Sequence, residues 1–362
     1  MSLTLEQVSG VVGGQTHIYP TDLTLTAGSL NVLLGPTLSG KTSLMRLMAG
    51  LDKPSAGRIL WNGEDVTDQP VQKRNIAMVY QQFINYPAMT VYDNIASPLK
   101  IRGLDKAAIE RRVMEAAELM KLGPMLQRRP MELSGGQQQR CALARALVKD
   151  ADLVLLDEPL ANLDYKLREE LREELPRIFT ASGAVFVYAT TEPTEALLLG
   201  GNTAAMWEGK VTQFGETLDV YRRPNDIVTA RVFSEPPMNF LSITKSGQQF
   251  SFGDGQTNAA SGALAGLADG KYTMGFRANH LRLTRPNADA ISIKVTVNVV
   301  EITGSESFVH LQHADDRWVA LVHGIQQPAS GTELEVYVDP ADVYVFGTDD
   351  ALVLAPAIAA AA

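Results

Sequence analysis

A glycine-rich segment near the N-terminus has the residue types and the spacing that bind phosphate. It reads Gly35, Pro36, Thr37, Leu38, Ser39, Gly40, Lys41, Thr42, and Ser43 continues the same predicted site. Backbone N–H groups in such a turn, with the positive end of the following helix, surround phosphate oxygens. The Lys41 ammonium is placed for the β- and γ-phosphates, and the Thr42 hydroxyl can bind Mg²⁺. The segment therefore predicts a phosphate-binding loop (P-loop).

A second segment supplies two carboxylates. The apolar run Leu153–Leu156 ends in Asp157 and Glu158. A buried strand with this ending brings Asp157 next to the P-loop, where it can hold Mg²⁺ directly or through water. Glu158 is then placed to polarise an attacking water as a general base. An acidic pair after a strand is often only the start of a loop, so the catalytic interpretation depends on the P-loop upstream.

A third segment lies about 20 residues before the acidic strand and precedes a helix over 138–147. It contains Ser134, Gly135, Gly136 and Gln137. With Ser134 as the N-cap, the two glycines leave backbone N–H groups free at a helix N-terminus, which is a second anion-binding device. In isolation a Ser-Gly-Gly sequence is only a flexible turn, and its position in this chain makes it more specific.

The elements that must position these segments follow from the hydrophobic pattern. Apolar runs that read as buried strands occur at 30–34, 76–80, 153–156 and 185–189, and helical periodicity fills about 90–150. Strands that alternate with helices around a P-loop predict an α/β sheet, here with a helical subdomain.

The composition changes after Ser234–Pro237. Residues 291–299 alternate strictly between apolar and polar, and 334–338 do the same, which is typical of half-buried strands. A chain of 362 residues is also too long for one ordinary core. We therefore predict two domains, an α/β domain over 1–239 and a small all-β domain over 240–362.

Composition restricts the class of protein. The net charge of −9, from 32 basic and 41 acidic residues, argues against nucleic acid as a partner. The only cysteine, Cys141, cannot form an intrachain disulfide, so a reducing compartment is expected. The N-terminus lacks the pattern of a signal peptide, and no stretch approaches 18 apolar residues. We expect a soluble, cytoplasmic protein.

Together the three segments resemble those of the nucleotide-binding subunit of an ATP-binding cassette (ABC) transporter. The resemblance implies that two subunits bind two ATP molecules head to tail, with the P-loop of one facing the signature residues 134–137 of the other. By position, Gln81 resembles the Q-loop glutamine that joins the metal site to the transmembrane partner, and Leu160–Asp164 resembles the D-loop at the dimer interface. The implied Mg²⁺ ligands are Thr42, Gln81 and Asp157.

Later segments are similar to the ATPase of the maltose-importer type. They are 220–224 and 236–240 at the end of the ATPase domain, and 275–281 and 301–306 in a C-terminal OB-like β-domain. The resemblance therefore covers essentially the whole chain.

Two residues depart from the family pattern. Thr191 stands where the family has a switch histidine, and a threonine has no imidazole to contact the γ-phosphate. Val12 stands where an aromatic residue usually stacks on adenine, although His17 and Tyr19 lie nearby. Both departures affect the chain's own site, whereas the signature that would serve a partner is intact. We therefore hypothesise a heterodimer with a second, related ATPase subunit rather than a homodimer.

The resemblance implies a peripheral subunit on the cytoplasmic side of the inner membrane that hydrolyses ATP to drive solute uptake. Its partners would be two transmembrane permease subunits and, indirectly, a periplasmic or extracellular solute-binding protein. A sugar or polyol is the expected solute, and the P-loop with Thr190–Pro193 is most similar to the glycerol-uptake branch. The alternatives are an iron, polyamine, sulfate or phosphonate importer, a weakly hydrolytic regulatory half of a heterodimer, and a non-transport ABC ATPase acting on DNA or ribosomes.

Overall fold

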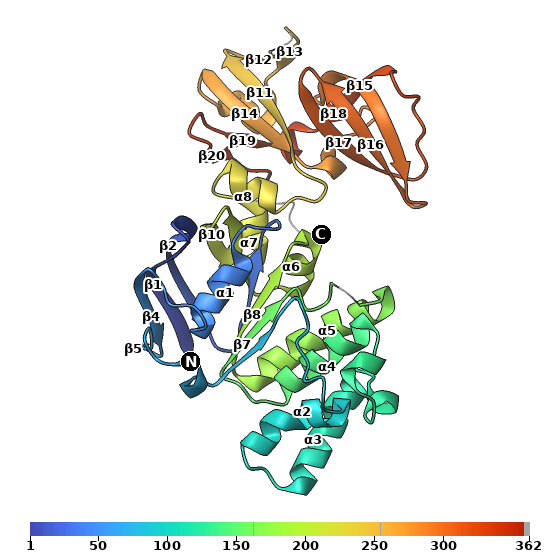
Figure 1. Ribbon diagram of the computed structural model, residues 1–362. Helices are drawn as coiled ribbons and strands as arrows, with labels where there is room; N and C mark the ends of the chain where they lie inside the picture. Colours follow the sequence, from blue (N-terminus) through green and yellow to red (C-terminus); the bar gives the residue numbers. More distant parts are fainter. Residues whose placement is uncertain (162, 254, 358–362) are drawn as a thin grey trace. The chain divides into compact units, whose positions relative to one another are not determined.

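The chain folds around separate hydrophobic cores in two units, Met1–Thr217 and Leu218–Ala362 (Figure 1). This computed structural model describes residues 1–161, 163–253 and 255–357. The predicted α/β part followed by an all-β part is confirmed. The predicted division after residue 239 stays a prediction, and the residues 358–362 that it assigns to the β-domain lie outside the described ranges.

A six-stranded sheet forms the centre of the first unit, in the order β10-β9-β3-β8-β7-β6. Strands β3, β7 and β8 are buried at every position, as expected for parallel strands covered on both faces. Because β3, β6, β7 and β8 run parallel, their carboxyl ends meet at one edge of the sheet. The strands are β3 (Leu30–Leu34), β6 (Ile76–Val79), β7 (Leu153–Asp157), β8 (Val185–Thr190), β9 (Asn202–Trp207) and β10 (Lys210–Glu216).

A smaller antiparallel sheet has the order β2-β1-β4-β5. Its apolar face and the central sheet share one core with helix α1 (Lys41–Ala49), which contributes Leu44, Met45, Leu47 and Met48. Helix α1 ends at Gly50, whose left-handed conformation caps it. The strands are β1 (Ser2–Val12), β2 (Gln15–Thr26), β4 (Ala56–Trp61) and β5 (Glu64–Asp65).

Helices α2 (Val91–Ile101), α3 (Lys106–Leu119) and α4 (Gly135–Leu147) lie together in the region predicted as a helical subdomain (Figure 1). Each of these helices, and α5 (Tyr165–Ser182), begins after an N-cap residue whose side chain accepts a hydrogen bond from a backbone N–H of the first turn. The N-cap residues are Thr90, Asp105, Ser134 and Asp164, respectively. Helix α6 (Pro193–Leu199) follows β8. Short 3₁₀ turns occur at Val71–Lys73, Gly123–Met125 and Pro130–Glu132.

The second unit contains two antiparallel sheets, in the orders β13-β12-β11-β14-β19-β20 and β17-β16-β15-β18. The alternation predicted around residue 295 is present, because Ile291, Ile293, Val295 and Val297 are buried in one core. The strands are β11 (Asn239–Ser246), β12 (Gln249–Phe252), β13 (Thr257–Ala259), β14 (Gly270–Phe276), β15 (Ile291–Ile302), β16 (Glu306–His313), β17 (Asp316–His323), β18 (Glu333–Val338), β19 (Tyr344–Phe346) and β20 (Leu352–Leu354).

Helices α7 (Thr217–Arg222) and α8 (Ile227–Val232) precede these strands. Arg277, at the end of β14, donates to the carbonyl oxygens of Phe233 at 2.7 Å and Tyr221 at 2.7 Å. Its guanidinium also lies 3.8 Å from the centre of the Tyr221 ring. These contacts join the helical segment to the β-sheets within the second unit.

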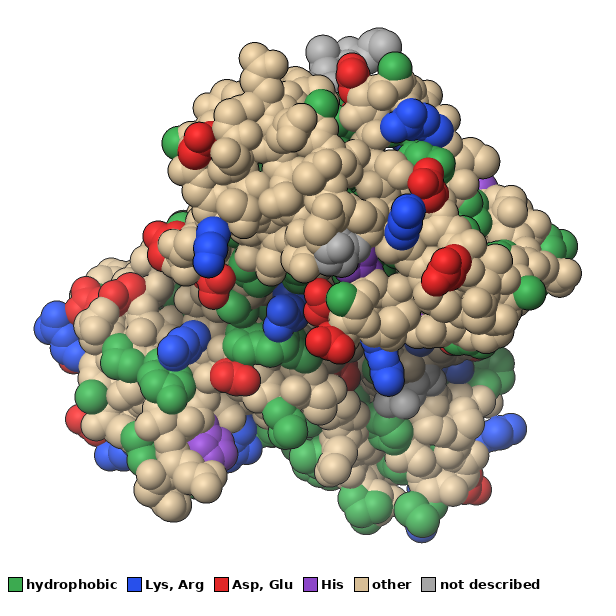
Figure 2. Space-filling model, turned by 90° about the horizontal axis from the view of Figure 1, so that it is seen from above, with side chains coloured by type: hydrophobic (Ala, Val, Ile, Leu, Met, Phe, Trp, Pro, Cys, Tyr) green, Lys and Arg blue, Asp and Glu red, His purple; other side chains and the backbone are tan. Residues whose placement is uncertain are grey.

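Charged side chains of both signs are scattered over the face drawn in Figure 2, without a continuous basic area among the described residues there. None of the described helices is long and apolar enough to span a bilayer.

Candidate nucleotide-binding site

The P-loop joins the end of β3 to the start of α1, and two of its glycines are required by geometry. A Cβ on Gly35 would lie 2.3 Å from the carbonyl oxygen of Met206, closer than any real contact. Gly40 has φ of +100°, a left-handed conformation that disfavours other residues, and a Cβ there would lie 2.9 Å from Ile18 Cδ1. The backbone can therefore fold closely against β9 and β2 at these two positions.

Lys41 and Thr42, at the start of α1, make hydrogen bonds to different partners. Lys41 is 5% exposed, and its Nζ donates to the carbonyl oxygens of Gly35 at 2.7 Å and Pro36 at 3.0 Å. Burial lowers the pKa of Lys41, which the nearby carboxylates partly oppose. The Thr42 hydroxyl donates to Asp157 Oδ2 at 2.7 Å. The loop thus holds one cation and one carboxylate-linked hydroxyl side by side.

The two carboxylates lie at the carboxyl end of β7. Asp157 is 3% exposed, and Glu158 Oε1 lies 3.9 Å from Lys41 Nζ. Gln81, which follows β6, donates from Nε2 to Glu158 Oε2 at 2.9 Å. Burial raises the pKa of both carboxyl groups, and the charge of Lys41 acts in the opposite direction. A glutamate with a raised pKa beside a lysine is suited to accept a proton near neutral pH.

Lys41, Gln81 and Glu158 line a cavity of about 590 Å³, which is large enough for a nucleotide, whereas Asp157 lies beside it on Thr42. Four further predicted site residues line it, Thr37, Gly40, Thr42 and Ser43, together with Leu38 of the same loop. The remaining wall comes from Gln15, Thr16, His17, Tyr19, Glu208 and Gly209. Sequence analysis had no signal for Glu208 and Gly209, because only the packing of the β9–β10 turn brings them here.

The part of the cavity wall that β2 forms is relevant to the aromatic contact with adenine that Val12 was predicted to lack. Tyr19 lies on the cavity, and Lys210 Nζ lies 4.8 Å from the centre of its ring. His17 also lines the cavity, whereas Val12 is 61% exposed at the end of β1 and does not. The aromatic surface of this cavity is therefore on β2.

The other predicted site residues lie elsewhere. Ser134 and Gln137 form a capping box, in which the Ser134 N–H donates to Gln137 Oε1 at 2.9 Å. Ser134 and Gly135 are exposed, and the four signature residues do not line the cavity. Thr191 is exposed after β8 and does not line it either. In the D-loop, Asn162 lies outside the described residues, and the carbonyl oxygen of Ala161 accepts from Arg168 Nη2 at 3.1 Å.

The donor set fits Mg²⁺. A threonine hydroxyl and a carboxylate are oxygen ligands of the kind that Mg²⁺ takes, and two protein oxygens leave positions for phosphate and water. Gln81 uses its Nε2 on Glu158, so its Oε1 is the atom left for a metal. No cluster of three or more His, Cys, Asp or Glu side chains that could hold a metal occurs in the described part of the chain. The ligand set Thr42, Gln81 and Asp157 stays a prediction.

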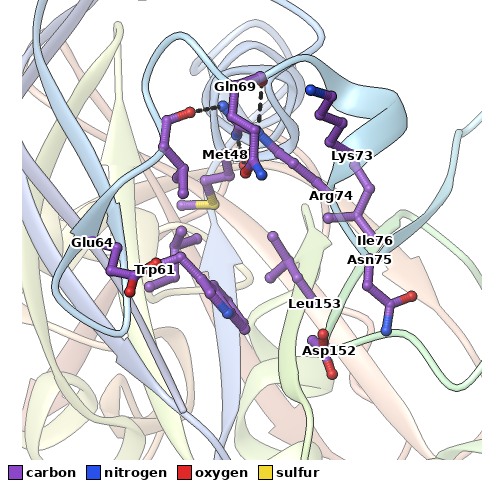
Figure 3. Close-up of a pocket in the computed structure, with 12 residues that line it drawn as sticks. Met48, Trp61, Glu64, Gln69, Lys73, Arg74, Asn75, Ile76, Asp152 and Leu153 are labelled. Atoms are coloured by element: carbon purple, nitrogen blue, oxygen red, sulfur yellow. Dashed lines mark hydrogen bonds between the residues drawn. The ribbon is translucent and has the colours of Figure 1, made fainter.

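A second hollow of about 230 Å³ lies at the amino ends of β6 and β7, at the opposite edge of the sheet (Figure 3). One of its charged lining residues is Arg74, which donates from Nε to the carbonyl oxygen of Gln69 at 3.1 Å and from Nη1 to that of Met48 at 3.2 Å. The guanidinium therefore ties loops together there, and this hollow lacks the converging groups of the first.

Comparisons with known proteins agree with this geometry. The ABC transporter family model matches residues 18–161, and the TOBE domain model matches 274–346. The chain is similar to the sn-glycerol-3-phosphate import ATP-binding protein UgpC of Yersinia enterocolitica, with 36% identity over 97% of this chain and 98% of that protein. It is 37% identical to UgpC of Salmonella typhi over 92% of this chain and 94% of that protein. A dimeric ATP-binding cassette in a post-hydrolysis state, bound to ADP and Pi, superposes with a TM-score of 0.55 and 26% identity, covering 59% of this chain and 98% of that one.

Proposed function

Because this chain belongs to the family of ATP-binding subunits of ABC importers, we propose that it binds ATP at the cavity beside the P-loop and hydrolyses it with Glu158 as the general base. The observation that carries the proposal is the meeting of Lys41, Gln81 and Glu158 on one cavity, with Thr42 and Asp157 joined at 2.7 Å beside it. The chain is an ATP hydrolase whose activity is coupled to solute uptake.

The chemistry can be assigned to side chains. Lys41 would exchange the carbonyl oxygens of Gly35 and Pro36 for phosphate oxygens, with which it makes stronger, charge-assisted hydrogen bonds. Bound Mg²⁺ would supply neutralisation of the phosphate charge. Glu158 would take the proton of the attacking water, and Gln81 orients its carboxylate. The P-loop glycines, Ser39 and Ser43 complete the proposed phosphate site.

A dimer accounts for the exposed signature. Ser134–Gln137 do not reach the chain's own cavity, so they are free to contact a nucleotide held by a second ATPase subunit. We infer a heterodimer with a related subunit, because Thr191 and Val12 replace two contacts to the nucleotide held here. The dimer would act beneath two membrane permease subunits on the cytoplasmic side of the membrane, and a solute-binding protein would deliver the solute to them. A homodimer is the alternative.

The relatives suggest the class of solute. Two of them are named as ATP-binding proteins for sn-glycerol-3-phosphate import, and the similarity spans nearly the whole chain. We propose uptake of a polyol or sugar, with a glycerol phosphate as the first candidate. Iron, polyamine, sulfate and phosphonate importers stay alternatives. Purifying the intact complex and identifying the solute that stimulates its ATPase activity tests this choice.

Two variants of the full chain test the ATPase assignment. Lys41→Ala should abolish tight ATP binding, because the charge that meets the phosphates is lost. Glu158→Gln should keep ATP binding and slow hydrolysis by roughly 10²–10⁴-fold, the usual contribution of a positioned base. The trapped ATP should also favour a dimer in size-exclusion chromatography. Lys73→Ala, at the rim of the second hollow, is the matched control and should change neither property. Unchanged affinity in Lys41→Ala would refute the assignment of the P-loop.

A further inference from the structure

Gln139 is a buried side chain of α4 that meets the backbone of the turn carrying Glu158. It is 1% exposed, and its Nε2 donates to the carbonyl oxygen of Pro159 at 2.6 Å and to that of Glu158 at 3.3 Å. Carbonyl oxygens only accept hydrogen bonds, so the amide nitrogen must be the atom that faces them. Its Oε1 is buried without a hydrogen-bond partner among the described residues. Such burial is unfavourable, so packing alone does not explain a glutamine here.

The turn that Gln139 holds is strained. Glu158 has φ of +47°, in the left-handed region that residues other than glycine rarely adopt. This conformation turns the Glu158 carboxylate from the line of β7 toward Gln81 and Lys41. Besides Gln139, two backbone hydrogen bonds hold the turn: the Glu158 N–H donates to the carbonyl oxygen of Ala189 at 3.0 Å, and the Ala161 N–H donates to that of Glu158 at 3.3 Å. Gln139 therefore adds a buried side-chain donor to two carbonyl groups of this turn, and for the Pro159 carbonyl it supplies the shorter of its two hydrogen bonds.

Helix α4 also contacts the segment that follows Gln81. Asn85 Nδ2 donates to the carbonyl oxygen of Gln138 at 2.9 Å, and Phe83 Cζ would lie 3.6 Å from a Cβ placed on Gly135. The same helix begins at the signature, since Ser134 is its N-cap. One rigid element thus links the signature, the Gln81 segment and the turn of Glu158.

We propose that Gln139 is a positioning residue for Glu158. Its two hydrogen bonds fix the left-handed turn so that the carboxylate faces the phosphate cavity, and they couple the position of α4 to the general base. Contact between the signature and a nucleotide of the second subunit would then act on Glu158 of this chain. The inference rests on the proposed function, in which Glu158 is the base.

Gln139→Met in the full chain tests the positioning role, because methionine has a similar length and no donors. We expect kcat to fall roughly 10- to 100-fold, since small misplacements of a reacting group have effects of this size, with the dissociation constant for ATP unchanged. Gln138→Met is the matched control. The Gln138 amide donates to the carbonyl oxygen of Leu133 at 3.3 Å, away from the catalytic turn, so its kcat should stay at the wild-type value. Gln139→Leu, which is apolar and also lacks donors, should behave like Gln139→Met and serves if that variant folds poorly.

A double-mutant cycle separates positioning from a general effect on folding. In the Glu158→Gln background, Gln139→Met should cause no further loss, because its effect passes through the missing base. Loss by the same factor in both backgrounds would overturn the inference while leaving Glu158 as the base. If Glu158→Gln alone leaves the rate unchanged, the proposed function fails and the inference fails with it.

Discussion

Replacing Arg172 by methionine is expected to destabilise the unit Met1–Thr217 strongly. Arg172 lies on α5 with 11% of its side chain exposed, and its Nη2 donates to Glu195 Oε1 and to Glu192 Oε2, both at 3.0 Å. Its Nη1 donates to Glu169 Oε1 at 2.6 Å. Glu195, on α6, is only 5% exposed. The Arg172–Glu195 pair therefore joins α5 to the start of α6, directly after the turn that carries Thr191.

The expected loss of stability depends on the carboxylates that lose Arg172 as a partner. Removing one partner of a buried ion pair costs about 3–5 kcal/mol, because the other charge stays buried. Glu195 would keep hydrogen bonds from the hydroxyl groups of Thr190 at 2.7 Å and Tyr188 at 3.1 Å, which favours the lower end of that range. Glu192 and Glu169 are 39% and 42% exposed, so water replaces their partner at little cost. We expect a loss of about 3 kcal/mol, or roughly 6–12 °C in the melting temperature of a unit of this size.

Differential scanning calorimetry of the full chain measures this loss. The transition that MgADP raises identifies the nucleotide-binding unit, because a ligand stabilises only the fold that binds it. Arg177→Met is the matched control on the same helix, since Arg177 is 74% exposed and pairs with Glu174 at 3.3 Å. It should cost about 0–1 kcal/mol. Equal shifts in the two variants would refute the reasoning from burial.

Two further predictions concern activity. Burial raises the pKa of Glu158, and only the ionised carboxylate can accept a proton. The chain should therefore be active above that pKa, and its activity should fall on acidification at a higher pH than for an ordinary glutamate. A pH profile of kcat/KM, which reports groups of the ligand-free protein, checks this, and an acid limb near the ordinary glutamate value would contradict it. Thr191→His should raise the chain's own ATPase rate, because it places an imidazole at the switch position. Full activity of the wild-type subunit alone, with no gain in the variant, would count against the heterodimer.

The main features of the site could be predicted from the sequence because they depend on local patterns. The P-loop spacing fixes a turn between a strand and a helix, and the continuous apolar run before Asp157 indicates a strand buried on both faces. Parallel strands then bring their carboxyl ends together, which is why Asp157 could be expected next to the P-loop, where it accepts from Thr42. The family expectation from these motifs is confirmed by the comparisons.

The remaining features depend on packing between distant segments. Gln139 is one of three consecutive glutamines; Gln137 was predicted from its place in the signature, but nothing in the sequence sets Gln139 apart from Gln138. Its role becomes visible only when α4 packs against the end of β7. Likewise, the predicted α/β domain over 1–239 included Ala230 and Met238, which share a core with Tyr344 and Phe346 in the second unit.

The contacts of α4 give a physical reason for an ATPase of this kind to need its partner. The general base adopts a backbone conformation that is unfavourable in isolation, and part of what holds it is an amide on the helix that begins at the signature. If a nucleotide on the second subunit orders that helix, it also orders Glu158. Under the heterodimer that we propose, Val12 and Thr191 would supply neither an aromatic ring nor an imidazole to a nucleotide held here, and neither residue lines the cavity. Ordering from the partner's site would therefore matter more here than in a symmetric pair, and this chain would hydrolyse ATP mainly within the assembled dimer.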